Sequence, residues 1–77
     1  MEEAMERFIG ALERLREAEA AKARCVADCY YDASYFCADQ YHAVEEAERE
    51  VADAFRAAID ARLIELGLLS QQSRGAP

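Results

Sequence analysis

The chain has no tryptophan, one proline and three glycines, and no glycine or proline lies between Ala11 and Leu66. It also has no apolar run of about 18 residues, the length that a membrane-spanning helix requires. Two of its first three residues are glutamates, which does not fit the basic start of a secretory signal peptide. We therefore expect neither a membrane span nor a signal peptide, and a cytoplasmic location.

Basic residues are scarce as well. The 16 aspartates and glutamates outnumber the 9 lysines and arginines, and the net charge is −7. This balance argues against direct binding to nucleic acid or to an anionic membrane. The sequence has no glycine-rich phosphate loop. A chain this small that forms only a helical hairpin would also offer no enclosed cleft for a substrate. We expect no enzymatic activity and no cofactor.

Strong helix formers dominate what remains, and no long segment alternates with period two, so the sequence predicts an all-α fold. We expect a helix over about 2–33, a turn over about 33–39 and a second helix over about 39–66. Together they would form one antiparallel hairpin domain, 1–69, followed by a flexible tail, 70–77. The alternative is one continuous coiled-coil helix, because the apolar stripes of the two halves are nearly in phase.

The expected ends of the helices follow from capping residues. Asp32 and Ser34 are residue types that cap helix N-termini, which favours a turn in this region. Gly67 directly follows Leu66, and a glycine in the left-handed conformation commonly ends a helix.

Apolar side chains of the first half recur every three or four residues and predict a buried seam. They are Met5, Phe8, Ile9, Leu12, Leu15, Val26 and Tyr30. Beside them, small residues recur every seven positions, which would let a neighbouring helix approach closely. These are Ala4, Ala11, Ala18 and Cys25.

A two-helix unit of this size buries too little apolar surface on its own. Ordering the chain costs roughly 1.5 kcal/mol per residue in conformational entropy. The free energy gained by burying so small a core only about equals that cost, so little net stability remains. The simplest remedy is a homodimer that forms a four-helix bundle.

The central segment, 25–53, holds eight acidic residues and one basic residue, so the whole net charge resides there. It also contains the three cysteines, the four tyrosines and the single histidine. Exposed tyrosines beside carboxylates are typical of protein-binding surfaces, and acidic ones suit a basic partner. Such a partner could itself bind nucleic acid. The predicted partner-binding residues are Asp28, Tyr31, Asp32, Tyr35, Phe36, Asp39, Tyr41, Glu45 and Glu46.

Two interpretations of this segment remain open. In the first, the chain is a small inhibitor or modulator of a basic protein, of a kind that bacteria, plasmids and phages encode; its eight arginines to one lysine fit such an origin. In the second, the aromatic residues fill the end of a bundle, and the chain is a structural subunit of a larger assembly.

The cysteines are expected to be free thiols, because their number is odd and cytoplasmic disulfides are rare. Plain packing is the favoured role, with no bound metal. The alternative is a zinc-stapled hairpin: if the turn centres on residue 35 or 36, two pairs of possible ligands face each other. Its four ligands would be Cys25, Cys29, His42 and Glu46.

Overall fold

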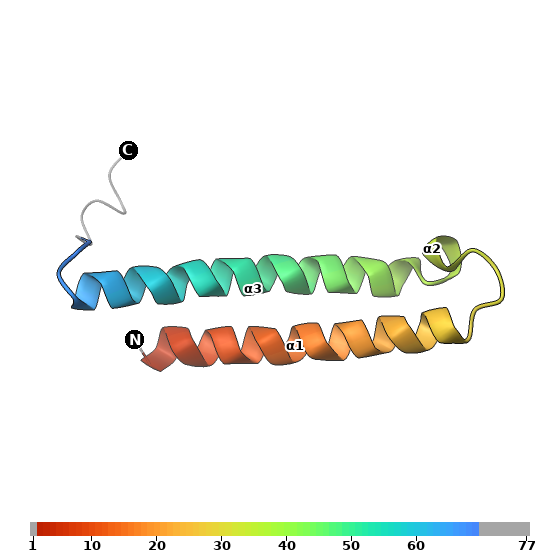
Figure 1. Cartoon of the computed structure of the whole chain (residues 1–77), viewed down its shortest axis with the longest axis horizontal. Coiled ribbons are helices and arrows are strands. Elements are labelled where there is room, and N and C mark those ends of the chain that lie inside the picture. Colours follow the sequence, from red (N-terminus) through yellow and green to blue (C-terminus); the bar gives the residue numbers. More distant parts are fainter. Residues whose placement is uncertain (1, 70–77) are drawn as a thin grey trace.

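The computed structural model describes residues 2–69, which form a two-helix antiparallel hairpin (Figure 1). Helix α1 spans Glu2–Ala27, the short helix α2 spans Ala33–Phe36, and α3 spans Ala38–Glu65. The described residues include no strand. The predicted hairpin is confirmed, and the alternative of one continuous helix is wrong. The predicted tail, 70–77, lies outside the described residues.

The chain turns earlier than the sequence predicted. Helix α1 ends at Ala27, whereas the prediction extended it to residue 33. The five residues that follow are Asp, Cys, Tyr, Tyr and Asp, all from the weaker half of the helix-propensity scale. Asp32 then caps α2, because its carboxylate accepts a hydrogen bond from the Ser34 amide at 3.1 Å. Helix α3 begins within one residue of its predicted start.

The C-terminus of α3 ends as the sequence predicted. Gly67 has a φ of 75°, a left-handed conformation that costs glycine little. Its amide donates to the Ile64 carbonyl at 3.0 Å, and the Leu68 amide donates to the Leu63 carbonyl at 2.9 Å. These two bonds define a Schellman motif, which satisfies carbonyls that the helix end would leave without partners.

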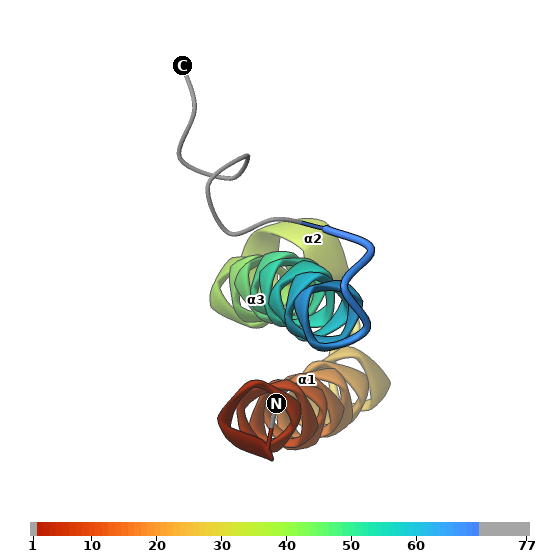
Figure 2. The same cartoon turned by 90° about the vertical axis from the view of Figure 1, so that its left-hand side faces the viewer.

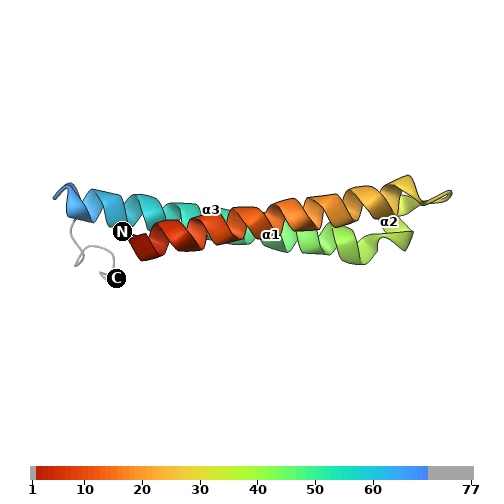
Figure 3. The ribbon, with the colours of Figure 1, turned by 90° about the horizontal axis from the view of Figure 1, so that it is seen from below.

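The two long helices lie side by side and cross at a shallow angle (Figures 2 and 3). Their contact buries alanines of both helices. Ala11 of α1 and Ala54 of α3 are completely buried, and Ala47 and Ala58 of α3 are nearly so. Of the predicted strip, Ala11 is therefore the member that the structure buries completely.

The larger apolar side chains lie beside this contact rather than inside it. Met5, Ile9, Phe55 and Ile59 are between 39% and 52% exposed. The largest side chain that is completely buried is that of Cys37. The predicted seam is thus only partly covered within one chain, and its last member, Tyr30, lies outside α1 and is 94% exposed.

The described chain is a single layer of helices, with a Cα extent of 13 Å in its thinnest direction. A stable domain normally packs two layers around its core. A hairpin alone has no second layer, which explains why its core consists mostly of alanine. No helix among residues 2–69 is long and apolar enough to cross a membrane.

Candidate functional site

The closed end of the hairpin, residues 28–37, carries four exposed aromatic side chains. We call Tyr30, Tyr31, Tyr35 and Phe36 the aromatic cluster; their exposed fractions are 94%, 80%, 74% and 60%. The first two belong to the loop after α1, and the other two belong to α2. None of them fills the end of the hairpin.

The rings of three cluster members contact one another. The Phe36 centroid lies 5.0 Å from that of Tyr35, with the rings nearly perpendicular, and 6.1 Å from that of Tyr31. Edge-to-face and tilted pairs of this kind are favourable because the positive edge of one ring meets the negative face of the other. These three rings therefore have a defined arrangement, although solvent reaches all of them.

Exposed carboxylates accompany the aromatic cluster. Asp28 and Asp32 lie in the loop, and Asp39 lies in the first turn of α3. Asp32 accepts hydrogen bonds from the Ser34 hydroxyl at 2.6 Å and from the Ser34 amide. The hydroxyl bond is the main cause that lowers the pKa of Asp32 below its ordinary value of 3.8. All three positions are predicted partner-binding residues that the structure brings to one end.

The remaining three predicted residues lie on α3, in the stem of the hairpin, which consists of the paired helices α1 and α3. Tyr41 is half-buried, and the Lys22 ammonium lies 4.3 Å from the centroid of its ring, a cation–π contact that ties α1 to α3. Glu45 and Glu46 are exposed on α3, and Glu46 lines a groove between the helices with Arg14 and Glu50. These three residues are separate from the aromatic cluster.

Tyr30 is the member of the cluster that sequence reasoning missed. The periodicity assigned it to the buried seam, because it follows Val26 by four residues on an extended helix. The helix ends at Ala27, so that spacing no longer describes a helical face. The weak helix propensity of 28–32 is the signal that could have revealed this.

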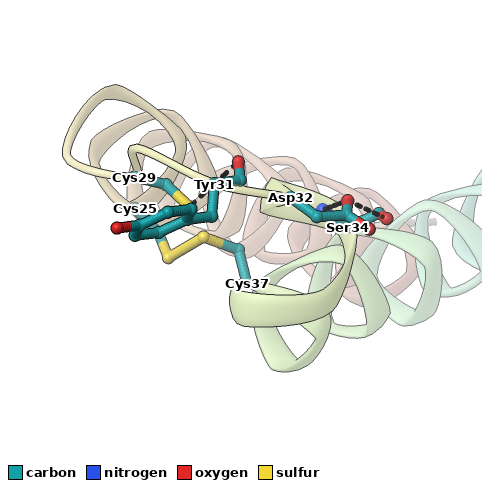
Figure 4. The surroundings of a disulfide bond; sticks show 6 residues. All are labelled: Cys25, Cys29, Tyr31, Asp32, Ser34 and Cys37. Atoms are coloured by element: carbon teal, nitrogen blue, oxygen red, sulfur yellow. Dashed lines mark hydrogen bonds between the residues drawn. A yellow bond between two sulfur atoms is a disulfide. The ribbon is translucent and has the colours of Figure 1, made fainter.

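A disulfide joins Cys25 to Cys37, and Cys29 is the one free cysteine of the chain (Figure 4). The expectation of three free thiols is therefore wrong for two of them. The bond ties the last turn of α1 to the residue directly before α3, with a Cα–Cα distance of 6.1 Å. This disulfide can form because facing residues of α1 and α3 are centred on an earlier residue of the chain than the sequence predicted.

Interhelical contacts define that centre. Arg14 forms an ion pair with Glu50, and the rings of Phe8 and Phe55 lie 5.6 Å apart. The midpoint of each pair, like that of the disulfide, falls at residue 31 or 32, whereas the zinc alternative needed 35 or 36. The difference is about one turn of helix.

The structure does not bring the four ligands of the zinc alternative together. Cys25 faces Cys37 rather than Glu46, and its sulfur is already bonded. No group of three or more His, Cys, Asp or Glu side chains able to hold a metal occurs among residues 2–69.

Comparisons with protein families, with curated proteins and with solved structures found no match for this chain.

Proposed function

We propose that the closed end of the hairpin binds a basic protein and modulates it, most simply as an inhibitor. The observation that supports this is the aromatic cluster: four large rings that are at least 60% exposed at one end of a small chain. Single proteins rarely expose contiguous apolar surface of this kind unless something binds it. Tyrosine in particular supplies a rigid apolar contact with a hydrogen-bonding tip.

The charge around the cluster favours a basic partner. Asp28, Asp32 and Asp39 are exposed there, and the segment 25–53 carries the whole net charge of the chain. Carboxylates around an apolar centre attract arginine and lysine side chains and speed the encounter. Rim charges of this type mainly affect the association rate, so binding should weaken as salt rises.

A capture experiment with one double variant tests the proposal. The immobilised chain is exposed to a native lysate, captured proteins are identified, and the affinity of the purified partner is then measured. We expect Tyr35→Ala/Phe36→Ala to lower the affinity at least tenfold while the helical content is unchanged. If this variant instead loses self-association of the chain, and its affinity for the partner falls no further than that loss explains, the structural-subunit interpretation is correct.

Charge is tested separately from the rings. The triple change of Asp28, Asp32 and Asp39 to Asn removes three charges at the closed end, and Asn preserves the cap at Asp32. Changing Glu2, Glu3 and Glu6 to Gln removes the same charge from the opposite end of α1. We expect only the first variant to slow association. Equal effects of both variants would contradict a localised acidic surface.

We also propose that the chain forms a homodimer through its stem. Met5 and Ile9 are four residues apart on α1, and Phe55 and Ile59 are four apart on α3, so each pair forms a stripe. The Phe8 and Phe55 rings lie 5.6 Å apart, so the first turns of α1 and the last turns of α3, which carry these pairs, are adjacent. A second hairpin packed on this stem stripe (Met5, Ile9, Phe55 and Ile59) would complete a four-helix bundle.

Sedimentation or light scattering tests the dimer. Ile59→Glu places a charge in the stem stripe and should convert the dimer to monomer. Ala20→Glu adds the same charge at an exposed position of α1 and should leave the dimer intact. A wild-type chain that is monomeric at high micromolar concentration would contradict the proposal.

The cytoplasm remains our proposed location. Because cytoplasmic thiols are kept reduced, the bond between Cys25 and Cys37 would be reversible there rather than permanent. Trapping the thiols of the chain in acid-quenched cells measures the fraction that is bonded.

A further inference from the structure

The three cysteines lie together at the closed end, a cluster that the proposed function does not use. Cys29, Cys25 and Cys37 line a single pocket of about 440 Å³, together with Tyr31 and Phe36. Figure 4 shows the side chains of Cys29 and Tyr31 beside the disulfide. A cysteine with a free thiol thus lines the same pocket as the two cysteines of a disulfide.

The backbone holds Cys29 close to the end of α1. After the last helical residue, the Asp28 amide still donates to the Arg24 carbonyl at 3.1 Å. The Cys29 amide donates to the Val26 carbonyl at 3.2 Å, so the chain continues to turn tightly. The Cys29 thiol donates a weak hydrogen bond to the Tyr31 carbonyl, with a sulfur–oxygen distance of 3.5 Å. The side chain is half-buried, so it is neither locked in a core nor free in solvent.

We propose that these cysteines form an intramolecular thiol–disulfide exchange site, in which Cys29 displaces Cys25 from Cys37. Cys29 first loses its proton to solvent, because the thiolate is the attacking species. Its sulfur forms a bond to the sulfur of Cys37 while the bond between Cys25 and Cys37 breaks. The electron pair of that bond leaves on Cys25, which takes up a proton. One disulfide and one thiol are present before and after, so no oxidant or reductant is consumed.

Attack on Cys37 is favoured over the other routes. Cys37 is completely buried, so a thiol from outside reaches it poorly, whereas Cys29 already lines the same pocket. Attack on Cys25 would instead join two cysteines only four residues apart and would leave Cys37 as a buried free thiol.

The exchange changes what the disulfide connects. In the structure it ties α1 to the start of α3. In the product it would close the shorter segment 29–37, which contains the whole aromatic cluster, and would release α1. The inference does not depend on the proposed binding function, although both concern the same end of the hairpin.

Peptide mapping can identify each disulfide isomer. Cleavage after Arg24 and before Asp28, Asp32 and Asp39 separates the cysteines into peptides 25–27, 28–31 and 32–38. The oxidised chain is incubated at pH 8.5 without added thiol, its free thiols are blocked at lower pH, and the linked peptides are identified by mass spectrometry. The starting chain gives 25–27 linked to 32–38. We expect a second product, 28–31 linked to 32–38, with Cys25 blocked.

The kinetics distinguish exchange within a chain from exchange between chains. The rate should be independent of protein concentration and should rise about tenfold per pH unit while the thiol is mostly protonated. Cys29→Ser should give no second product. Cys25→Ser, treated with glutathione disulfide, should form the bond between Cys29 and Cys37.

Three results would overturn the proposal. One is a folded chain that keeps only the disulfide between Cys25 and Cys37, while the same chain unfolded in guanidinium yields all three possible disulfides. Another is a rate that rises with protein concentration. The third is a Cys25→Ser variant that yields only mixed disulfides with glutathione.

Discussion

Cys25, in the last turn of α1, is bonded to Cys37, the residue directly before α3. The bond closes a segment of 12 residues in sequence separation. A crosslink across a segment of this length restricts the unfolded chain and stabilises the folded one by about 3 kcal/mol. For a hairpin whose core is mostly alanine, this is a large share of the total.

Reduction should therefore destabilise the hairpin strongly. We expect a phosphine reductant to lower the free energy of unfolding by about 2–4 kcal/mol, measured by urea titration of the helical circular dichroism signal. The Cys29→Ser variant should show the same loss on reduction, because Cys29 takes no part in the bond. Coincident unfolding curves with and without reductant would contradict this.

The close approach of the two long helices depends on small side chains. Ala54 is completely buried at their contact, so Ala54→Leu should force the helices apart and destabilise the fold by about 1–3 kcal/mol. Ala52 is exposed on the same helix, and Ala52→Leu should change stability by less than about 0.5 kcal/mol. Urea midpoints of the two variants give the comparison. Equal midpoints would mean that the alanine contact does not hold the helices together.

The ion pair between Arg14 and Glu50 links α1 to α3 but should contribute little to stability. Both side chains are about half exposed, and exposed pairs typically contribute about 0.2–1 kcal/mol. A double-mutant cycle with Arg14→Ala and Glu50→Ala should give a coupling energy in this range that falls at high salt. A coupling above about 2 kcal/mol would contradict a solvent-screened pair.

Much of the fold was predictable because it depends on periodic patterns. The absence of glycine and proline between Ala11 and Leu66 predicts long helices, and the seven-residue spacing of small residues predicts their close contact. The cap at Gly67 follows from a single residue type. Each of these features is encoded locally, within a few residues of where it acts.

The turn and the disulfide could not be derived in the same way. The segment 28–32 contains no glycine or proline, so the end of α1 is set by modest propensities and by the cap at Asp32. Moving the turn shifts the partner of every α1 residue by twice as many positions along α3, so Cys25 lies opposite Cys37 and not opposite Glu46. Three cysteines also allow three pairings, and spacing alone does not choose among them.

The aromatic cluster could be predicted only in part, because the position of the turn decides which rings are exposed. Tyr31, Tyr35 and Phe36 were assigned to the surface because a single seam cannot bury every ring. The periodicity predicts Tyr30 in that seam, and Tyr41 is among the predicted partner-binding residues, whereas Tyr30 is exposed and Tyr41 is half-buried. The positions of the site residues thus depend on where the chain turns, whereas the presence of the two long helices does not.

Asp32 gives the turn a specific pH dependence. Hydrogen bonds from Ser34 lower its pKa below 3.8, so the ionised carboxylate favours the folded turn. Its contribution is complete above pH 3.8 and is lost as the pH falls through the lowered pKa of the folded state. We expect the Ser34 amide resonance to shift with a midpoint below 3.8 in an NMR titration. Asp32→Asn should abolish that transition but retain the cap, whereas Asp32→Ala should also expose the Ser34 amide to faster hydrogen exchange. A midpoint at or above 3.8 in the folded chain would show that Ser34 does not stabilise the carboxylate.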